Sequence, residues 1–281
     1  MKVLVTGARG MLGGEVCDAL ASEHEARGVD IEDFDLTDAA ATRAALSDER
    51  PSLVIHCAAW TDVDGCERDP ERAFRQNAQG SWNLAAACAH VGAGVVYIST
   101  DFVFDGEKGE AYTEFDLPNP LNAYGASKLA GENAVRRLVA SSYVVRSAWL
   151  FGHRGRNFVR AILEAAREKD EIRVVSDQIG SPTYARDLAE AIVRLIVSGP
   201  LTPGTYHLVN EGSCAWSELA SEALRIAGLP ARVRPIPSSE WPSPTRRPAC
   251  SALRSRWLEL QGVGGLRPWK EALASYLEDL A

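Results

Sequence analysis

The sequence predicts an α/β protein in which a doubly wound parallel sheet is followed by a smaller, loop-rich C-terminal region. In the first half of the chain, short unbroken apolar runs alternate with helical stretches, a pattern typical of parallel strands covered by helices on both faces. A glycine-rich turn directly follows the first apolar run. Prolines recur between residues 200 and 248, and proline lacks the amide hydrogen that a central strand needs. Together these observations favour the Rossmann arrangement.

The order of the elements follows from the same patterns. Strands are predicted over residues 3–5, 53–57, 95–99 and 143–146, with another strand ending near residue 30. Helices are predicted over residues 11–22, 69–90, 122–139, 215–227 and 268–280. Residues 172–197 resemble a further strand and helix that could return to the sheet. We therefore expect a sheet domain of residues 1–150 plus roughly 171–198, and a second region of roughly 151–170 and 199–281.

Composition and charge exclude several classes of protein. With 46% hydrophobic and 24% charged residues, the chain of 281 residues has the usage of a folded globular protein. Its net charge of -8 argues against nucleic acid as a partner. No apolar run approaches the roughly 20 residues that cross a bilayer, and the start is too short before its first glycine to be a signal peptide. We expect a cytoplasmic protein without a membrane partner.

Cysteine spacing gives no sign of a metal or redox centre. The six cysteines are spread widely and contain no Cys-x-x-Cys pair. Each lies beside apolar or helical sequence, so we expect small core residues in a reducing compartment. No metal site is predicted.

The glycine-rich turn predicts a dinucleotide site. Gly7, Gly10 and Gly13 follow the first strand at the mouth of a helix. Glycine permits a tight turn and a close backbone approach to a pyrophosphate, and the helix N-terminus supplies amide donors. The alternative is a glycine-rich turn in a nucleotide-free α/β protein. The position of the turn after the first strand favours cofactor binding.

An acidic residue after the second strand bears on the choice of cofactor. Asp30 follows Gly10 by about 20 residues, where an acid would bond the ribose hydroxyls of the adenosine. A carboxylate there would repel a 2′-phosphate, which favours NADH over NADPH, although Arg27 nearby acts against that preference. The alternative is that the acids of residues 30–35 form a solvated loop.

A tyrosine and a lysine are spaced for acid–base chemistry. Tyr124 and Lys128 lie four residues apart, on one face of a predicted helix. A free tyrosine has a pKa of about 10, and a nearby cation would lower it toward the range that proton transfer needs. Thr100 ends the third apolar strand, at the edge where open α/β sheets bind ligands. The alternative is a surface pair with a packed tyrosine and a solvated lysine.

These motifs together resemble the extended short-chain dehydrogenase/reductase family, and residues 77–84 resemble a helix signature of that family. Four further motifs resemble its dTDP-4-dehydrorhamnose reductases. They are Ala58-Ala59-Trp60-Thr61-Asp62-Val63-Asp64, Ser99-Thr100-Asp101-Phe102-Val103-Phe104, Asp177-Gln178-Ile179-Gly180-Ser181-Pro182-Thr183 and Arg246-Arg247-Pro248. The resemblance spans nearly the whole chain, and several motifs at the right intervals are more specific than any one of them.

The resemblance implies an activity and a set of roles. Tyr124 would protonate the C4 carbonyl oxygen of a nucleotide-linked sugar while hydride arrives from NADH or NADPH. Lys128 would bind the nicotinamide ribose and lower the pKa of the tyrosine. Thr100 would tune Tyr124 and, with Asp101, contact the sugar. The first domain would bind NAD(P) and the second region the substrate.

The resemblance also implies binding residues. Trp149 matches a residue that lines the sugar pocket, although a tryptophan alone is more often a core aromatic. Arg246 or Arg247, with Arg247 preferred, could clamp a pyrophosphate, although a loop salt bridge is the alternative. Cofactor contacts are implied at Gly10, Met11, Leu12, Asp35, Leu36, Ala59, Trp60 and Thr61, besides Gly7, Gly13, Asp30, Tyr124 and Lys128.

Departures from the pattern keep other functions open. In the reductases that the chain resembles, a tyrosine usually occupies the position of Phe102, and a residue with a hydroxyl group often occupies the position of Ala148. Some relatives bind magnesium between subunits, for which Glu15 is a candidate, but no cluster of ligands is visible. The competing functions are a regulatory subunit like the β subunit of methionine adenosyltransferase, and a reductase or epimerase of another nucleotide sugar. The chain could also form a homodimer.

Overall fold

A six-stranded parallel sheet forms the larger part of the molecule, which is described here by a computed structural model covering residues 1–199 and 201–280. The strand order is β10-β5-β4-β3-β1-β2. The strands are β1 (Lys2–Thr6), β2 (Glu25–Val29), β3 (Leu53–His56), β4 (Gly94–Thr100), β5 (Ser142–Ser147) and β10 (Gly204–His207). All five pairings are parallel. This confirms the predicted fold class.

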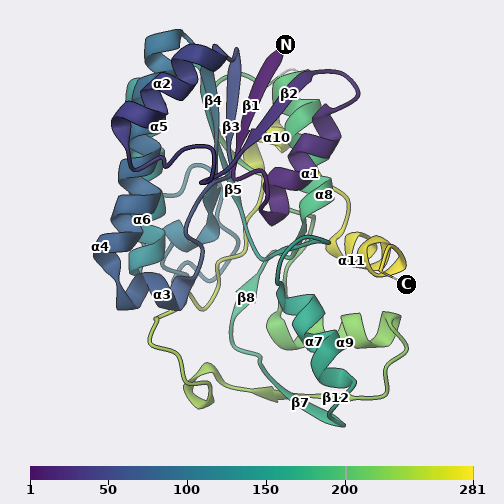
Figure 1. Ribbon diagram of the computed structural model, residues 1–281. Helices are drawn as coiled ribbons and strands as arrows, with labels where there is room; N and C mark the ends of the chain where they lie inside the picture. Colours follow the sequence, from purple (N-terminus) through teal and green to yellow (C-terminus); the bar gives the residue numbers. More distant parts are fainter. Residues whose placement is uncertain (200, 281) are drawn as a thin grey trace.

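Helices cover both faces of the sheet (Figure 1). One face carries α2 (Ala39–Glu49), α5 (Gly80–Val91) and α6 (Ala123–Leu138), and the other carries α1 (Met11–Leu20) and α8 (Ala185–Ile192). The central strands carry unbroken apolar runs, which are buried on both sides of the sheet. All seven residues of β4 are buried, for example. Its unbroken apolar run is what predicted a strand covered on both faces.

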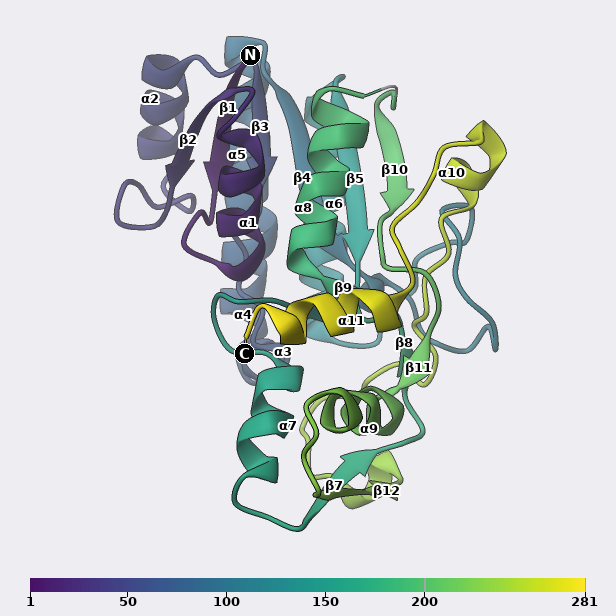
Figure 2. The ribbon, with the colours of Figure 1, turned by 90° about the vertical axis from the view of Figure 1, so that its right-hand side faces the viewer.

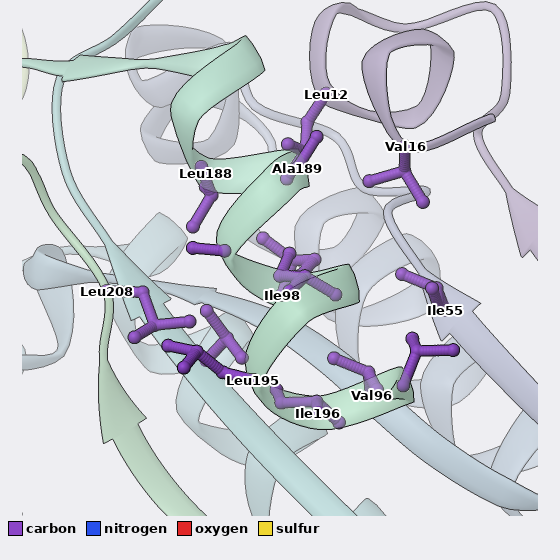
Figure 3. Close-up of a cluster of buried hydrophobic side chains, with 14 of the residues drawn as sticks. Leu12, Val16, Ile55, Val96, Ile98, Leu188, Ala189, Leu195, Ile196 and Leu208 are labelled. Atoms are coloured by element: carbon purple, nitrogen blue, oxygen red, sulfur yellow. The ribbon is translucent and has the colours of Figure 1, made fainter. Parts of the chain in front are cut away.

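Alternate side chains of the strands enter two separate cores. Val96 and Ile98 of β4 pack against α1 and α8, whereas Val95 and Tyr97 pack against the helices of the other face. Figure 3 shows the first core, in which Leu188 and Ala189 of α8 lie near Leu12 of α1, while Leu195 and Ile196 of the following turn lie at the other end, near Leu208 and Val96. The predicted return of a helix from the 172–197 segment is therefore present.

A smaller unit lies beyond the carboxyl ends of the strands (Figures 1 and 2). It consists of α7 (Phe158–Ala166) and α9 (Trp216–Ile226), packed on the parallel pair β7 (Glu171–Val175) and β12 (Arg232–Ile236). The last helix, α11 (Trp269–Glu278), lies between this unit and the sheet in both views. Its buried side chains join a core with residues of α9 and with Tyr184 of β9 (Thr183–Tyr184).

Two strands lie elsewhere than the sequence predicted. The strand at residues 171–175 forms, but it pairs with β12 in the smaller unit and not with the central sheet. Its side chains alternate, with Ile172 and Val174 buried and Glu171 and Arg173 exposed, as expected for a strand with one solvated face. Conversely, β10 was expected in the second region but forms the sheet edge beside β5. Its four residues include Gly204 and Thr205, so the apolar run typical of a central strand is missing.

Short elements complete the chain and carry much of the site. They are α3 (Val63–Arg68), α4 (Pro70–Ala73), the π-helical turn η1 (Phe74–Gln79), η2 (Asp101–Val103), β6 (Leu150–Phe151), β8 (Ile179–Gly180), β9 (Thr183–Tyr184), η3 (Val193–Val197), β11 (Cys214–Ala215), η4 (Ser238–Glu240) and α10 (Arg256–Gln261). The helix predicted over residues 69–90 is thus divided into α4, η1 and α5. Within the described residues, no helix combines the length and apolar character needed to cross a bilayer.

Candidate active site

The turn between β1 and α1 lets a ligand approach the backbone closely. Gly7 has a φ of +68°, in the left-handed region that favours glycine, and the amide of Gly10 donates to the Gly7 carbonyl at 3.0 Å. A Cβ at Gly13 would overlap the Gly7 carbonyl oxygen. Because Gly10 has no side chain to cap α1, the first amides of the helix are available to an anion. The turn therefore fits the pyrophosphate of a dinucleotide.

The acidic residues predicted to bind ribose line a hollow beside this turn. Its walls are Thr6, Gly7, Val29, Asp30, Ile31, Phe34, Asp35, Leu36, Ala58 and Gln76. The Asp30 carboxylate accepts the amide of Arg9 at 3.0 Å and that of Ile31 at 2.9 Å. Arg27 pairs with Glu49 instead of pointing toward Asp30. Arg27 therefore does not neutralise the negative charge of the wall that carries Asp30.

Arg9 is the cation nearest to Asp30 along the turn. Its guanidinium lies 2.9 Å from Glu32, and both side chains are more than half exposed. Asp35, on the same wall as Asp30, accepts the amide of Thr37 at 2.8 Å. The hollow thus presents two carboxylates, with Arg9 neutralised by its own acidic partner.

The backbone after β3 is held by one buried amide side chain. Asn77 of η1 accepts the Trp60 amide at 2.7 Å and donates to the Trp60 carbonyl at 3.1 Å. Its amide also donates to Ser127 of α6 at 3.0 Å. Ala59 and Trp60 are half-buried and Thr61 is exposed. Asn77 therefore fixes the predicted cofactor segment 59–61 relative to α6.

Tyr124 lies in the first turn of α6 because of a well-formed N-cap. The side chain of Asn122 accepts the Gly125 amide at 2.9 Å, and its amide group donates to the Arg246 carbonyl at 3.0 Å. Tyr124 is buried, with its ring edge-on to Phe102 at 5.7 Å between centroids. A Cβ at Gly125 would overlap the Phe102 carbonyl, so glycine allows α6 to approach η2 this closely.

Lys128 lies one turn further along α6 and is also buried. Its Nζ is 4.3 Å from the ring centroid of Tyr97. Burial lowers the pKa of Lys128 to about 8, although Glu132 and Cys57 act to raise it. The predicted surface alternative, a solvated lysine, is therefore excluded by the structure.

A buried ion-pair network anchors the next turn of α6. Arg146 of β5 donates twice to the Glu132 carboxylate, at 2.9 Å from both Nε and Nη2. Arg136 and Ser99 donate to the same carboxylate at 2.6 and 2.5 Å. Burial would raise the pKa of Glu132, but the bonds and charge of Arg146 hold it below its usual range. The network fixes α6 against β4 and β5, and with it the Tyr124–Lys128 face.

Thr100 and Asp101 meet the C-terminal segment at the end of β4. Thr100 Oγ1 donates to Asp101 Oδ1 at 3.0 Å, and Ser251 Oγ donates to Asp101 Oδ2 at 2.5 Å. Asp101 is 2% exposed. Burial raises the pKa of its carboxyl to about 6, although the bonds from Ser251 and Thr100 act to lower it.

The electrostatics of Tyr124 differ from the prediction. Burial raises the pKa of the phenol, and the nearby Asp101 carboxylate adds to this effect. Hydrogen bonding to Thr100 acts in the opposite direction. The lysine was expected to lower the pKa, but Lys128 lies over the ring of Tyr97 and burial dominates. The phenol is therefore protonated at neutral pH.

Trp149 is held in a strained position beside the smaller unit. Its φ is +46°, which is unusual for a residue with a Cβ. Its indole stacks on Trp216 at 3.4 Å between centroids and 7° between planes. On the other side Gly180 approaches so closely that a Cβ would overlap the Trp149 ring. The ring is thus fixed by residues of β8 and α9.

A groove of about 890 Å³ opens between α7, β7 and the segment 238–247. Aromatic side chains in its walls are Phe158, Trp216 and Trp241, and the cationic ones are Lys169, Arg173, Arg246 and Arg247. Arg247 Nη2 lies 2.9 Å from Asp64 of α3, whereas Arg246 pairs with exposed Glu107 at 3.3 Å. Aromatic faces and cations are the groups that bind a nucleoside diphosphate.

Glu15, the candidate magnesium ligand, faces arginines. It is buried on α1, with Arg154 at 3.5 Å and Arg186 at 4.0 Å. Among the residues that the structure describes, no group of three or more His, Cys, Asp and Glu side chains could hold a metal ion.

Three contributors to the site were not identified from the sequence. Gly180 lies inside a motif that we quoted, but its contact with Trp149 has no local signal. Trp216 begins a predicted helix and looks like a core residue. Ser251 lies just after the proline-rich segment, and its bond to Asp101 spans 150 residues of sequence.

The chain is similar to proteins of known function over nearly its whole length. The family model of the RmlD substrate binding domain matches residues 1–281. The dTDP-4-dehydrorhamnose reductase of Streptomyces griseus is 41% identical, over 96% of this chain and 91% of that protein. The dTDP-4-keto-6-deoxy-D-glucose reductase of Streptomyces niveus is 38% identical, over 96% of this chain and 94% of that protein.

A solved structure adds a bound cofactor. The crystal structure of dTDP-4-dehydrorhamnose reductase from Bacillus anthracis in complex with NADP matches with a TM-score of 0.95 and 39% identity. The match covers 100% of this chain and 99% of that one.

Proposed function

Since this chain belongs to the RmlD substrate binding domain family, we propose that it reduces the C4 ketone of dTDP-4-dehydro-L-rhamnose to dTDP-L-rhamnose with NADH or NADPH. The observation that carries the proposal is the pair Tyr124 and Lys128, buried one turn apart on α6, beside the end of the strand that carries Thr100. A regulatory subunit would not need a buried phenol and ammonium at the ligand-binding edge of the sheet.

The reduction adds a hydride and a proton across the carbonyl. When bound, the reduced nicotinamide supplies the hydride to C4. Tyr124 holds its proton at neutral pH, since burial raises the pKa of the phenol, and it transfers this proton to the carbonyl oxygen as charge develops there. Thr100, which acts to lower the pKa of the phenol, would stabilise the resulting tyrosinate by turning its hydroxyl proton from Asp101 to the phenol oxygen.

Lys128 has one role in the proposal. Its ammonium would bind the ribose next to the nicotinamide. Burial lowers the pKa of Lys128 to about 8, so the cation is still the main form at neutral pH. Glu132 on the following turn supports the charged form.

The glycine turn and its hollow would hold the rest of the cofactor. The amides at the start of α1 would bind the pyrophosphate, and Asp30 and Asp35 would face the adenosine ribose. Because Arg27 and Arg9 are both paired with glutamates, the wall keeps its negative character. We therefore propose a preference for NADH over NADPH. Leu12 contributes through its backbone only, since its side chain lies in the core (Figure 3).

The sheet unit would thus bind NAD(P), and the groove of the smaller unit would bind the nucleotide sugar. Trp149 and Asp101 would contact the sugar, and Arg247 the pyrophosphate. A second candidate substrate is another dTDP-linked 4-ketosugar, which is favoured by the relative named for dTDP-4-keto-6-deoxy-D-glucose. The formation of a homodimer by this chain stays a prediction.

The test is a direct assay of the purified protein. We would mix it with dTDP-4-dehydro-L-rhamnose and either NADH or NADPH, follow the absorbance of the reduced nicotinamide, and identify the product. Substrate-dependent oxidation that yields dTDP-L-rhamnose supports the proposal. If the cofactor binds but only dTDP-4-keto-6-deoxy-D-glucose is turned over, the second candidate replaces the first. Cofactor binding without turnover of either sugar contradicts both.

A further inference from the structure

One buried hydroxyl at the carboxyl edge of the sheet has no role in the site described so far. Ser147 is the last residue of β5 and pairs in register with Thr100, the last residue of β4. Neighbours in register on adjacent strands project to the same face of a sheet. The side chain of Ser147 therefore lies next to that of Thr100, on the same face.

This hydroxyl is buried without a partner. Ser147 is 4% exposed, and within the described residues its Oγ forms no hydrogen bond. Thr100 does not supply one, because its Oγ1 donates to Asp101 and accepts the Phe102 amide at 3.2 Å. A buried hydroxyl without a partner costs about 1–3 kcal/mol, so such groups usually meet one in the functional state.

The position of Ser147 indicates which part of a ligand would reach it. A dinucleotide crosses the carboxyl edge of the sheet, with its adenosine beside β2 and its nicotinamide in the other half. The glycine turn follows β1, and β4 and β5 lie on the opposite side of β1 from β2. Ser147 is thus in the nicotinamide half, together with Thr100. The nicotinamide ring carries one polar substituent, its carboxamide, which can both donate and accept hydrogen bonds.

We propose that Ser147 Oγ forms a hydrogen bond to the carboxamide of the bound nicotinamide. The inference rests on the proposed cofactor site. Such a bond fixes the rotation of the ring about its bond to ribose, and so decides which face of the ring is turned to the sugar. Ala148, which follows Ser147, is 3% exposed and has no polar side-chain atom that could replace the hydroxyl.

Binding measurements test the proposal without relying on turnover. Titration calorimetry would give the dissociation constants of NADH and of ADP-ribose, which lacks the nicotinamide, for the wild type and for Ser147→Ala. We expect the variant to bind NADH about five- to tenfold more weakly, as for the loss of one hydrogen bond of about 1 kcal/mol. ADP-ribose should bind unchanged. NADPH and 2′-phospho-ADP-ribose form a second pair for the same comparison.

Two further variants control for structure. Ser147→Thr keeps the hydroxyl and should restore NADH binding to within about twofold of wild type. Ser142→Ala removes another buried hydroxyl at the opposite end of β5 and should affect neither ligand. Thermal denaturation checks that each variant is folded.

The proposal is overturned by any of three results. An unchanged NADH constant in Ser147→Ala means that water satisfies the hydroxyl. An equal loss for NADH and ADP-ribose means that the residue acts through the fold. A raised KM for the sugar with unchanged NADH binding assigns the hydroxyl to the substrate. The first two results come from binding alone and do not depend on whether the assay of the proposed reaction succeeds, whereas the third is read only where the sugar is turned over.

Discussion

At Tyr124, burial and hydrogen bonding act on the phenol in opposite directions. Burial raises its pKa and the bond to Thr100 lowers it, with burial the larger effect. The sequence predicts the spacing of Tyr124 and Lys128, because helical periodicity is a local property. It could not predict the direction of the pKa, because burial comes from Phe102 and Cys66, which other segments bring to the tyrosine.

Removing the phenol oxygen tests the catalytic assignment. In Tyr124→Phe, we expect kcat to fall by roughly 10²–10⁴, the usual contribution of a positioned proton donor. The dissociation constant of NADH should stay within about threefold, because the glycine turn and its hollow are distant in sequence and intact. Stopped-flow turnover and calorimetry measure the two quantities. A variant with near wild-type kcat would remove Tyr124 from the mechanism.

Asp101 predicts a specific dependence of stability on pH. Its carboxyl has a pKa of about 6 in the folded protein against an ordinary 3.8, so the folded state holds this proton more tightly. Below about pH 4 both states are protonated and the residue costs nothing. Between about pH 4 and pH 6 the unfolded chain has lost this proton while the folded protein still holds it, so stability falls by up to about 3 kcal/mol, and above pH 6 both states are ionised and the loss stays constant.

The matched comparison is wild type against Asp101→Asn, which keeps the shape but does not ionise. Denaturant unfolding at pH 4, 5, 6 and 7 gives the free energy of unfolding of each. Relative to the variant, the wild type should lose about 2 kcal/mol between pH 4 and pH 7, most of it below pH 6. A difference that is constant over this range would mean that the carboxyl ionises normally.

At the scale of the elements, apolar runs predicted the central strands well and missed the place of the edge strand β10. The strands β1, β3, β4 and β5 form where unbroken apolar residues predicted them, because they are buried on both faces. The edge strand β10 and the separate pair β7–β12 are decided by tertiary packing. A strand with one solvated face has the same local pattern whichever sheet it joins.

The N-cap of α6 couples the stability of the helix to the position of Tyr124. Asn122→Ala removes the cap and the bond to the Arg246 carbonyl, and should lower the free energy of unfolding by about 1–2 kcal/mol. Because Tyr124 lies two residues later, kcat should fall by at least about tenfold, as expected for a small displacement of a reacting group. Denaturant unfolding and turnover measure the two effects.

Asp38→Ala is the matched control for this prediction. Asp38 caps α2 by accepting the amides of Ala40 and Ala41, and α2 carries no residue of the site. The control should lose similar stability with unchanged kcat. If both variants lose activity equally, the effect of Asn122 comes from general destabilisation and not from Tyr124.

At the scale of the whole molecule, part of the candidate site is held by contacts between distant segments. Trp149 follows β5 but is fixed by Trp216 and Gly180, and Asp101 follows β4 but is bonded to Ser251. These contacts join residues up to 150 positions apart, which explains why sequence spacing did not reveal them. The motifs predict which residues belong to the site, and the packing of distant segments determines which of them touch.

Arg247 connects the C-terminal segment to α3 by its ion pair with Asp64. Removing the Arg247 side chain therefore affects both this connection and any bond to the substrate.

Two variants separate these roles. If Arg247 binds the pyrophosphate, Arg247→Ala should raise the KM for the nucleotide sugar by about 10- to 100-fold, the value of a charged hydrogen bond. Asp64→Asn breaks the ion pair but keeps the cation, so its KM should stay within about threefold. Steady-state kinetics with saturating cofactor measure both. Equal rises in KM for the two variants would assign Arg247 to the junction between the units and leave the pyrophosphate to Arg246.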